Sequence, residues 1–319
     1  MNAVEETLKL EIAQKKKKLK QLSGKEVLDV KKTSLQEVVQ RVSPYLVDLI
    51  RLASKVPKKS EDSIELEARL GRFDKVRNAF VPGVSKEFMD SCIGIFTSWD
   101  GWAPLPPFKN GTERTAKHAW RHMVDTFYQV PSTSSSDSIT IRTTTTFDDD
   151  EPNFVHCRKD KLAYVDLVSE SNEDLPSYSL DNVYDVRVAA SKEHPIHPSA
   201  LPPSVHITTP IFTRKKLRRS FFYKPLGASK AFWRFDFTIS WEGNTLIEAD
   251  KNQAEDKNTR YEIEVECCDP QSYLENAEKA APYLAASLLL KVKKDLLERG
   301  SKRKDVFFRA IQSRTFVEV

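Results

Sequence analysis

Two segments of the chain alternate polar and apolar residues with a strict period of two. They are SIELEARLGRF, residues 63–73, and RYEIEVEC, residues 260–267. Their polar positions are Glu65, Glu67, Arg69, Glu262, Glu264 and Glu266. Because side chains alternate between the two faces of a β-strand, each segment is predicted to be a strand with carboxylates on one face. In an ordinary amphipathic strand such a face meets water.

Short β-like segments follow one another from residue 61 onward. They are residues 63–70, 120–130, 139–147, 153–158, 161–168, 182–190, 213–223, 231–240, 244–249 and 260–267. Polar or proline-rich connections, such as residues 192–204, separate them, and this spacing favours an antiparallel barrel or sandwich. Within residues 271–300 a helix is expected to pack on the barrel and end at Gly300, with one apolar stripe formed by Leu284, Leu288, Val292 and Leu296.

The first 60 residues differ in charge from the remainder. They carry 14 Lys and Arg against 7 Asp and Glu. We interpret residues 1–60 as a basic helical extension and residues 61–319 as the catalytic domain. Two helices are expected to meet near Pro44, because proline interrupts an amphipathic stretch there. The run Lys15–Lys18 is either a solvated helix face or a patch for nucleic acid or nuclear import.

Composition excludes several other classes of protein. A mean hydropathy of −0.50 with 30% charged residues excludes a membrane protein, and no secretory signal is evident. Only nine glycines are present, and no phosphate-binding glycine loop is found. The four cysteines lack metal-site spacing and are expected to be reduced thiols. His118 and His122 have the spacing of a helical pair that could bind zinc, but we interpret them as surface or packing histidines.

Cations follow the same alternation in two further segments. TRKKLRRSFFY, residues 213–223, and WRFDFTIS, residues 233–240, place polar residues on one face: Arg214, Lys216, Arg218, Ser220, Arg234, Asp236 and Thr238. If these faces and the glutamate faces turn into the barrel, its lumen has carboxylates opposite cations. Clustered carboxylates require ion pairs or a divalent cation, and oxygen ligands favour Mg²⁺ or Mn²⁺. Arginine suits phosphate groups. The pattern therefore points to phosphoryl transfer to water.

Six segments resemble, in order, the site strands of one enzyme family. They are IELEARLG, ITIRTTTTFDD, DVRVAASKE, RKKLRRS, RFDFT and YEIEVE. Together they resemble the fungal and protozoan RNA 5′-triphosphatases of mRNA capping, the mRNA capping enzyme beta chain, within the triphosphate tunnel metalloenzymes. The resemblance implies an α+β, mainly antiparallel fold: a closed eight-stranded β tunnel with flanking helices.

The resemblance also implies roles for individual residues. The metal ligands would be Glu65, Glu67 and Glu266, and the catalytic and phosphate-binding residues would be Glu193, Arg142, Lys216 and Arg218, with Glu193 orienting or deprotonating water. Residues that orient neighbours or brace the walls would be Arg214, Arg234, Asp236, Thr238, Glu262 and Glu264. Cys157 stands where the family has a lysine, and either Arg158 or Lys159 takes that role.

The implied function is a metal-dependent RNA 5′-triphosphatase. It would remove the γ-phosphate from triphosphate-ended nascent mRNA, the first step of capping, in the nucleus, with Mg²⁺ or Mn²⁺ and with Mn²⁺-dependent nucleoside triphosphatase activity. No nucleotidyl-lysine KxDG motif is evident, so a separate guanylyltransferase partner is expected, and the family contains both homodimers and monomers. Two alternatives remain: a tunnel enzyme acting on tripolyphosphate, thiamine triphosphate or another nucleoside triphosphate, and a binding module whose polar strands face solvent.

Overall fold

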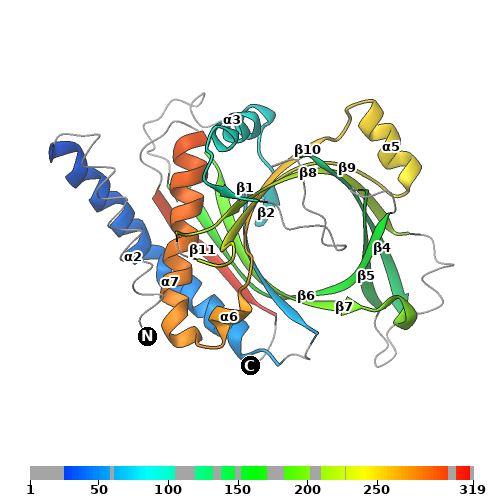
Figure 1. Cartoon of the computed structure of the whole chain (residues 1–319), viewed down its shortest axis with the longest axis horizontal. Helices are drawn as coiled ribbons and strands as arrows, with labels where there is room; N and C mark the ends of the chain where they lie inside the picture. The colour runs from blue at the N-terminus through cyan, green and yellow to red at the C-terminus, as the bar shows by residue number, and fades with distance from the viewer. Residues whose placement is uncertain are drawn as a thin grey trace.

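A closed antiparallel β-barrel forms the centre of the molecule, and Figure 1 looks into its opening. The computed structural model describes residues 25–57, 61–104, 119–131, 138–147, 152–170, 183–201, 210–226, 228–300 and 307–316. Around the ring the strands are β1 (Ser63–Asp74), β7 (Asp185–Ile196), β6 (Asn153–Glu170), β5 (Ser138–Thr146), β4 (Arg121–Pro131), β8 (Phe212–Tyr223), β9 (Trp233–Gly243) and β10 (Arg260–Cys267). Pairing of β1 with β10 closes the ring. The predicted eight-stranded tunnel is therefore confirmed.

Several strands differ in extent from the prediction. Residues 153–170 form one strand, β6, instead of two, with a bulge between Lys161 and Ala163. Strand β7 continues through Pro195, inside the expected proline-rich connection. The pairing of β7 with β1 extends only as far as Glu193, which lies opposite Ser63. Beyond it, one edge of β7 has no partner strand at Pro195, so the backbone N–H that proline lacks is not needed there.

Three short strands that were not predicted pair with the ring. Strand β2 (Ala79–Pro82) pairs with β1, β3 (Trp102–Ala103) pairs with β8, and β11 (Phe307–Thr315) pairs with β6. The strand expected at residues 244–249 is wrong. Thr245 instead caps helix α5 (Leu246–Ala254), because its side chain accepts a hydrogen bond from the backbone N–H of Glu248.

Helix α2 (Lys25–Lys55) continues through Pro44 without a break, so the expectation of two helices is wrong. Its buried residues Val42, Leu46 and Ile50 lie on both sides of the proline in the main core, and the helix packs against α7 (Ala277–Leu290). Because proline has no backbone N–H, the helix loses one hydrogen bond at Pro44. The tertiary packing compensates for this loss. The run Lys15–Lys18 lies outside the described residues.

The C-terminal helical region packs on the barrel as predicted. It consists of α6 (Gln271–Leu274), α7 and the π-helix η3 (Lys291–Glu298), and helical structure continues to Gly300. The predicted stripe of Leu284, Leu288, Val292 and Leu296 is buried. None of the described helices has the length and apolar content needed to cross a membrane.

The apolar face of the barrel strands points outward, toward the helices. Leu66 of β1, Phe235 of β9 and Val265 of β10 lie in the core cluster together with Leu288 of α7. Phe96 of α3 (Lys86–Thr97) packs its ring 5.0 Å from that of Phe235. Because the apolar parity of each strand is used on the outside, the polar parity faces the lumen. The polar faces therefore turn into the barrel, which is the condition that the sequence analysis set for a charged lumen.

Candidate active site

Strand register brings the three predicted metal ligands into one region of the lumen. Glu67 of β1 lies directly opposite Glu266 of β10, and Glu65 lies two residues earlier on the same face of β1. Lys159 of β6 contacts the Oε2 atom of Glu65 and lies 3.6 Å from Oε1 of Glu67. Arg234 of β9 contacts Glu266. In this arrangement the carboxylates of β1 and β10 are paired with cations of β6 and β9.

Burial makes two of the glutamates, Glu266 and Glu67, hold protons more readily than exposed carboxylates do. It raises the pKa of Glu266 to about 8; Arg234 opposes this shift, and repulsion from Glu65 adds to it. Burial likewise raises the pKa of Glu67, while Arg69 lowers it. A cation placed among carboxylates of this kind favours their charged form.

The donor set suits a hard divalent cation. Three carboxylates from two neighbouring strands offer only oxygen ligands, which Mg²⁺ and Mn²⁺ prefer. Within the described ranges no three His, Cys, Asp or Glu side chains already converge as a metal cage. The carboxylates instead contact Lys159 and Arg234. The three carboxylates therefore fit a divalent metal ion, which would replace Lys159 and Arg234 as their positively charged partner.

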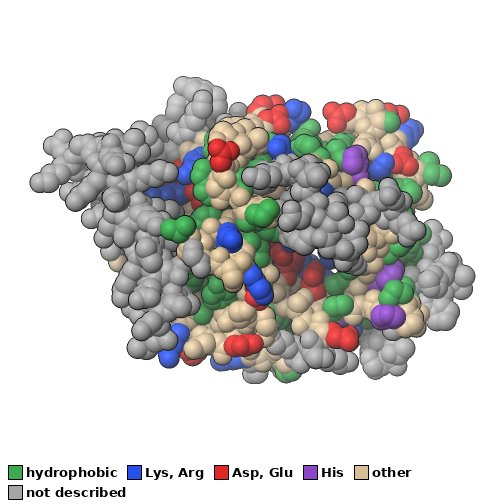
Figure 2. All heavy atoms as spheres, viewed as in Figure 1, with side chains coloured by type: hydrophobic (Ala, Val, Ile, Leu, Met, Phe, Trp, Pro, Cys, Tyr) green, Lys and Arg blue, Asp and Glu red, His purple; other side chains and the backbone are tan. Residues whose placement is uncertain are grey.

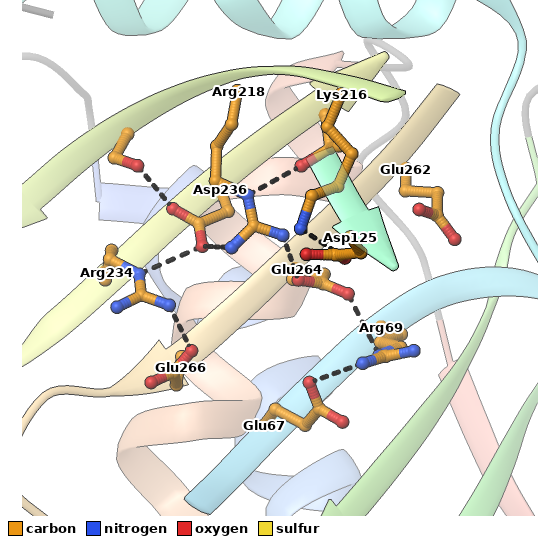
Figure 3. A network of polar contacts seen from close by, with 12 residues as sticks. Glu67, Arg69, Asp125, Lys216, Arg218, Arg234, Asp236, Glu262, Glu264 and Glu266 are labelled. Carbon is orange, nitrogen blue, oxygen red and sulfur yellow. Dashed lines mark hydrogen bonds and ion pairs between the residues drawn. The ribbon is translucent and has the colours of Figure 1, made fainter. Parts of the chain in front are cut away.

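Arg218 is the centre of the polar network on β8, β9 and β10 (Figure 3). Its Nη1 donates to Asp236 at 2.9 Å and its Nη2 donates to Glu264 at 3.3 Å. Its Nε donates to the hydroxyl of Thr238 at 3.0 Å. Arg234 also donates to Asp236, at 2.9 Å. The predicted phosphate-binding residue Arg218 thus forms one connected wall with four of the predicted bracing residues, Arg234, Asp236, Thr238 and Glu264.

Glu264 connects this wall to β1. Arg69 Nε lies 3.0 Å from one of its oxygens, and Arg69 also donates to Glu67 at 3.0 Å. Although burial raises it, the pKa of Glu264 is held well below its usual range by Arg69 and Arg218. Burial and repulsion from Glu264 raise the pKa of neighbouring Glu262, which accepts a long hydrogen bond of 3.5 Å from Arg214.

Lys216 lies on β8, which is separated from β1 by β9 and β10 in the strand order. Its ammonium group lies 2.5 Å from Asp125 of β4, and the Lys216 side chain is only 7% exposed. Burial lowers the pKa of Lys216 to about 8, repulsion from Arg218 lowers it further, and Asp125 opposes both. The same Asp125 lies 3.7 Å from Arg214 and accepts a hydrogen bond from Thr144.

The third predicted phosphate-binding residue, Arg142 of β5, donates to Glu193 of β7 at 3.1 Å. Lys159 stands opposite Glu193 in the β6–β7 register. Arg158 instead turns to the other face of β6, where it contacts Asp160 and His194. Of the two candidates for the family's lysine, Lys159 is therefore the one that lies with the other predicted site residues.

A cavity of about 350 Å³ runs along the lumen. Its lining includes Glu67, Arg69, Arg142, Lys159 and Arg214. The space-filling view shows acidic and basic side chains at the bottom of a hollow in the molecule (Figure 2). Strands far apart in sequence thus supply both signs of charge to one cavity.

The sequence-based list of site residues omits Arg69 and Asp125. Arg69 shares the lumen-facing parity of Glu65 and Glu67, so the alternation contains a signal for it. Asp125 lies between Met123 and Phe127 on one face of β4. A single acid between apolar residues does not produce the alternation that identified the other site strands. Its place in the network depends on its pairing with β8.

Comparisons with known proteins bear on the family and the fold of the chain. Residues 106–288, more than half of the chain, match the family model "mRNA capping enzyme, beta chain". The structure resembles the Pct1 RNA triphosphatase of S. pombe, with a TM-score of 0.51, 16% identity, and coverage of 83% of this chain and 92% of that one. A second Pct1 structure, in complex with the Spt5 CTD, gives a TM-score of 0.51 and 17% identity, with 83% and 94% of the two chains covered.

The capping enzyme triphosphatase of Mimivirus is also similar, with a TM-score of 0.41, 12% identity, and coverage of 75% and 96%. No curated protein sequence matches the chain. Glu65 and Glu67 precede the residues matched by the family model, whereas Glu266 lies within them. The extent of that match, with a fold shared with Pct1, shows that the chain belongs to the mRNA capping enzyme beta chain family and is an RNA 5′-triphosphatase of mRNA capping.

Proposed function

We propose that the barrel lumen holds the triphosphate end of RNA and a divalent metal, Mg²⁺ or Mn²⁺, with Glu65, Glu67 and Glu266 as the metal ligands. The observation that carries this proposal is the register of β1 and β10, which sets Glu67 against Glu266. A divalent cation there would neutralise charge on the phosphoryl oxygens and orient them. Lys159 and Arg234, which contact these glutamates, would then be released toward the phosphates.

Arg142, Lys216 and Arg218 would bind the phosphate oxygens. Each now contacts a carboxylate of the protein, so a triphosphate would replace internal acceptors rather than meet free cations. The wall formed by Arg214, Arg234, Asp236, Thr238, Glu262 and Glu264 would keep these cations in place. Preorganised charge of this kind stabilises the transition state of phosphoryl transfer.

Glu193 would orient the attacking water. Its Oε1 accepts from Arg142, and its side chain is one quarter exposed within the lumen. Water would attack the γ-phosphorus, the bond from that phosphorus to the β–γ bridging oxygen would break, and the water proton would pass to Glu193. The products would be a diphosphate-ended RNA and inorganic phosphate.

Further proposals concern the cell and the rest of the chain. We place the protein in the nucleus, with a separate guanylyltransferase to complete the cap, and with Mn²⁺-dependent nucleoside triphosphatase activity. We retain residues 1–60 as a basic extension whose helix α2 packs on the domain of residues 61–319. We also propose that the protein forms a homodimer. A complex of Pct1 with the Spt5 CTD supports a search for a similar peptide partner.

The test is phosphate release from triphosphate-ended RNA by Glu65→Gln, Glu67→Gln and Glu266→Gln with Mg²⁺ and then Mn²⁺. Each change keeps side-chain size but removes ligand charge, so hydrolysis should disappear while the protein stays folded in a thermal melt. Glu87→Gln, at an exposed position on α3, is the matched control. Retained hydrolysis by the lumen variants would refute the assignment of the metal ligands.

A further inference from the structure

The lumen cavity opens to solvent at a rim that the catalytic network does not use. Thr140, Lys161 and Phe316 line the same cavity as Glu67 and Lys159, and all three are exposed. Lys161 lies two residues beyond Lys159 on β6, a distance of about 6 to 7 Å along a strand. A molecule whose triphosphate lies beside Lys159 can therefore extend past Lys161.

Lys161 differs from the other cations of the cavity. Arg69, Arg142, Lys159 and Arg187 each contact a carboxylate, whereas Lys161 forms no ion pair with the part of the chain that the structure describes. Its ammonium group is thus available to an external anion. A lysine of this kind in a groove is typical of a contact to a nucleic-acid phosphate.

Phe316 is the exposed end of a fixed aromatic column. The Arg187 guanidinium lies 5.0 Å from the ring centre of Phe80 and 4.0 Å from that of Tyr164, and two hydrogen bonds to Asp166 hold it. The Tyr164 and Phe316 rings are 5.9 Å apart. The backbone N–H of Phe316 donates to the carbonyl of Leu162 at 2.8 Å.

The Phe316 ring is therefore held in place while it remains 42% exposed. The guanidinium of Arg314, also exposed, lies 4.9 Å from the same ring centre. A fixed, exposed aromatic ring beside cations is a typical platform for an unpaired nucleobase, because every base can stack on it without sequence preference.

We propose that Phe316 and Lys161 form a subsite for the 5′ end of single-stranded RNA at this rim. The first nucleoside stacks on Phe316, and the phosphodiester that follows it binds Lys161. This inference rests on the proposed function, because it requires the triphosphate to lie in the lumen. It makes one rim of the tunnel the side from which the RNA chain leaves the active site.

The test compares kcat/KM for a triphosphate-ended oligoribonucleotide with kcat/KM for inorganic tripolyphosphate, which has no nucleoside. Phe316→Ala should lower the ratio of RNA to tripolyphosphate at least about fivefold, the lower end of what one base stack contributes, and Phe316→Tyr should restore it. Lys161→Ala should lower the same ratio and make KM for RNA less dependent on salt, because one phosphate contact is lost.

Two control variants should keep the wild-type ratio: Phe154→Ala, an exposed phenylalanine on β6, the strand of Lys161, and Lys224→Ala, an exposed lysine after β8. Lys161 is exposed, so its variant remains informative even where Phe316→Ala unfolds. The subsite is refuted if Lys161→Ala and folded Phe316→Ala both keep the wild-type ratio of kcat/KM for RNA to kcat/KM for tripolyphosphate. Efficient RNA hydrolysis by the parent protein would then leave the proposed function standing. Hydrolysis of tripolyphosphate without any hydrolysis of RNA would overturn the proposed function itself.

Discussion

The protonation of Lys216 should set the upper pH limit of substrate capture. Burial lowers its pKa to about 8 from the ordinary value of 10.5, with Arg218 adding to the shift and Asp125 opposing it. Since only the ammonium form attracts phosphate strongly, the free enzyme loses this proposed contact as the pH rises through about 8. Replacing Lys216 with arginine keeps the positive charge far above that pH.

The pKa fixes the expected size of the effect. At pH 9, about one unit above it, roughly nine tenths of the free enzyme carries neutral Lys216. The value of kcat/KM, which reports the free enzyme, should therefore fall about tenfold below its plateau. A bound triphosphate raises the pKa of the neighbouring lysine, so kcat should fall much less.

The same shift changes stability with pH. Between about pH 8 and pH 10.5 the unfolded chain keeps the Lys216 proton while the folded protein releases it. Because the unfolded state binds more protons in this window, the Lys216 contribution to the free energy of unfolding should rise with pH, by up to about 3 kcal/mol. Below pH 8 both states hold the proton, and this contribution should not depend on pH.

The assay is phosphate release from triphosphate-ended RNA between pH 6.5 and 9.5. Lys216→Arg should have a lower plateau, because arginine fits the lysine site less well, but no decline near pH 8. Lys215→Arg is the matched control, since Lys215 precedes Lys216 on β8 and contacts Asp250 of α5; its profile should be that of the wild type. A decline at the same pH in wild type and Lys216→Arg would refute the reasoning.

Other changes test separate parts of the site. Glu193→Gln should lower kcat by about 100-fold or more while the affinity for Mn²⁺, measured by calorimetry, persists; lost Mn²⁺ binding would argue against a role confined to water. Arg218→Lys should lower kcat/KM at least about tenfold in steady-state assays, because an ammonium cannot replace the planar donor set; unchanged kinetics would place Arg218 outside the site. Leu66→Ala should cost about 2 to 5 kcal/mol in urea unfolding, because Leu66 is buried in the outer core. A smaller loss than that of Glu65→Gln on the opposite face would contradict the assignment of the two faces.

Alternation alone predicted the strands that carry the site, but not which face would be enclosed. In β1 and β10 the apolar parity is continuous, so either a solvated or an enclosed polar face fits the sequence. What distinguishes the two is packing: Leu66 and Val265 meet helix residues such as Leu288 on the outside. Leu66 and Leu288, which share this core cluster, are more than 200 positions apart in the chain, and no local pattern contains such packing.

Each error has a physical cause, which is local in one case and tertiary in the other two. Residues 244–249 contain apolar and β-branched side chains typical of a strand, but Thr245 and Glu248 have the spacing of a helix capping box, and that signal prevails. Pro44 was expected to end a helix, yet tertiary packing of Leu46 and Ile50 maintains it. Asp125 could be identified only from its neighbours on β8, because register determines what a lone acid contacts.

Closure of the barrel between β1 and β10 has a consequence for how the enzyme is made. Glu67 and Glu266 meet across this seam although about 200 residues separate them in the chain. During synthesis, a nascent chain that ends before β10 leaves β1 and β9 with open edges, which can pair with other chains. Contacts between such distant segments also form late in folding. Catalytic activity should therefore arise only in polypeptides that extend through β10, so translation products that end before this strand would be inactive as well as prone to aggregate.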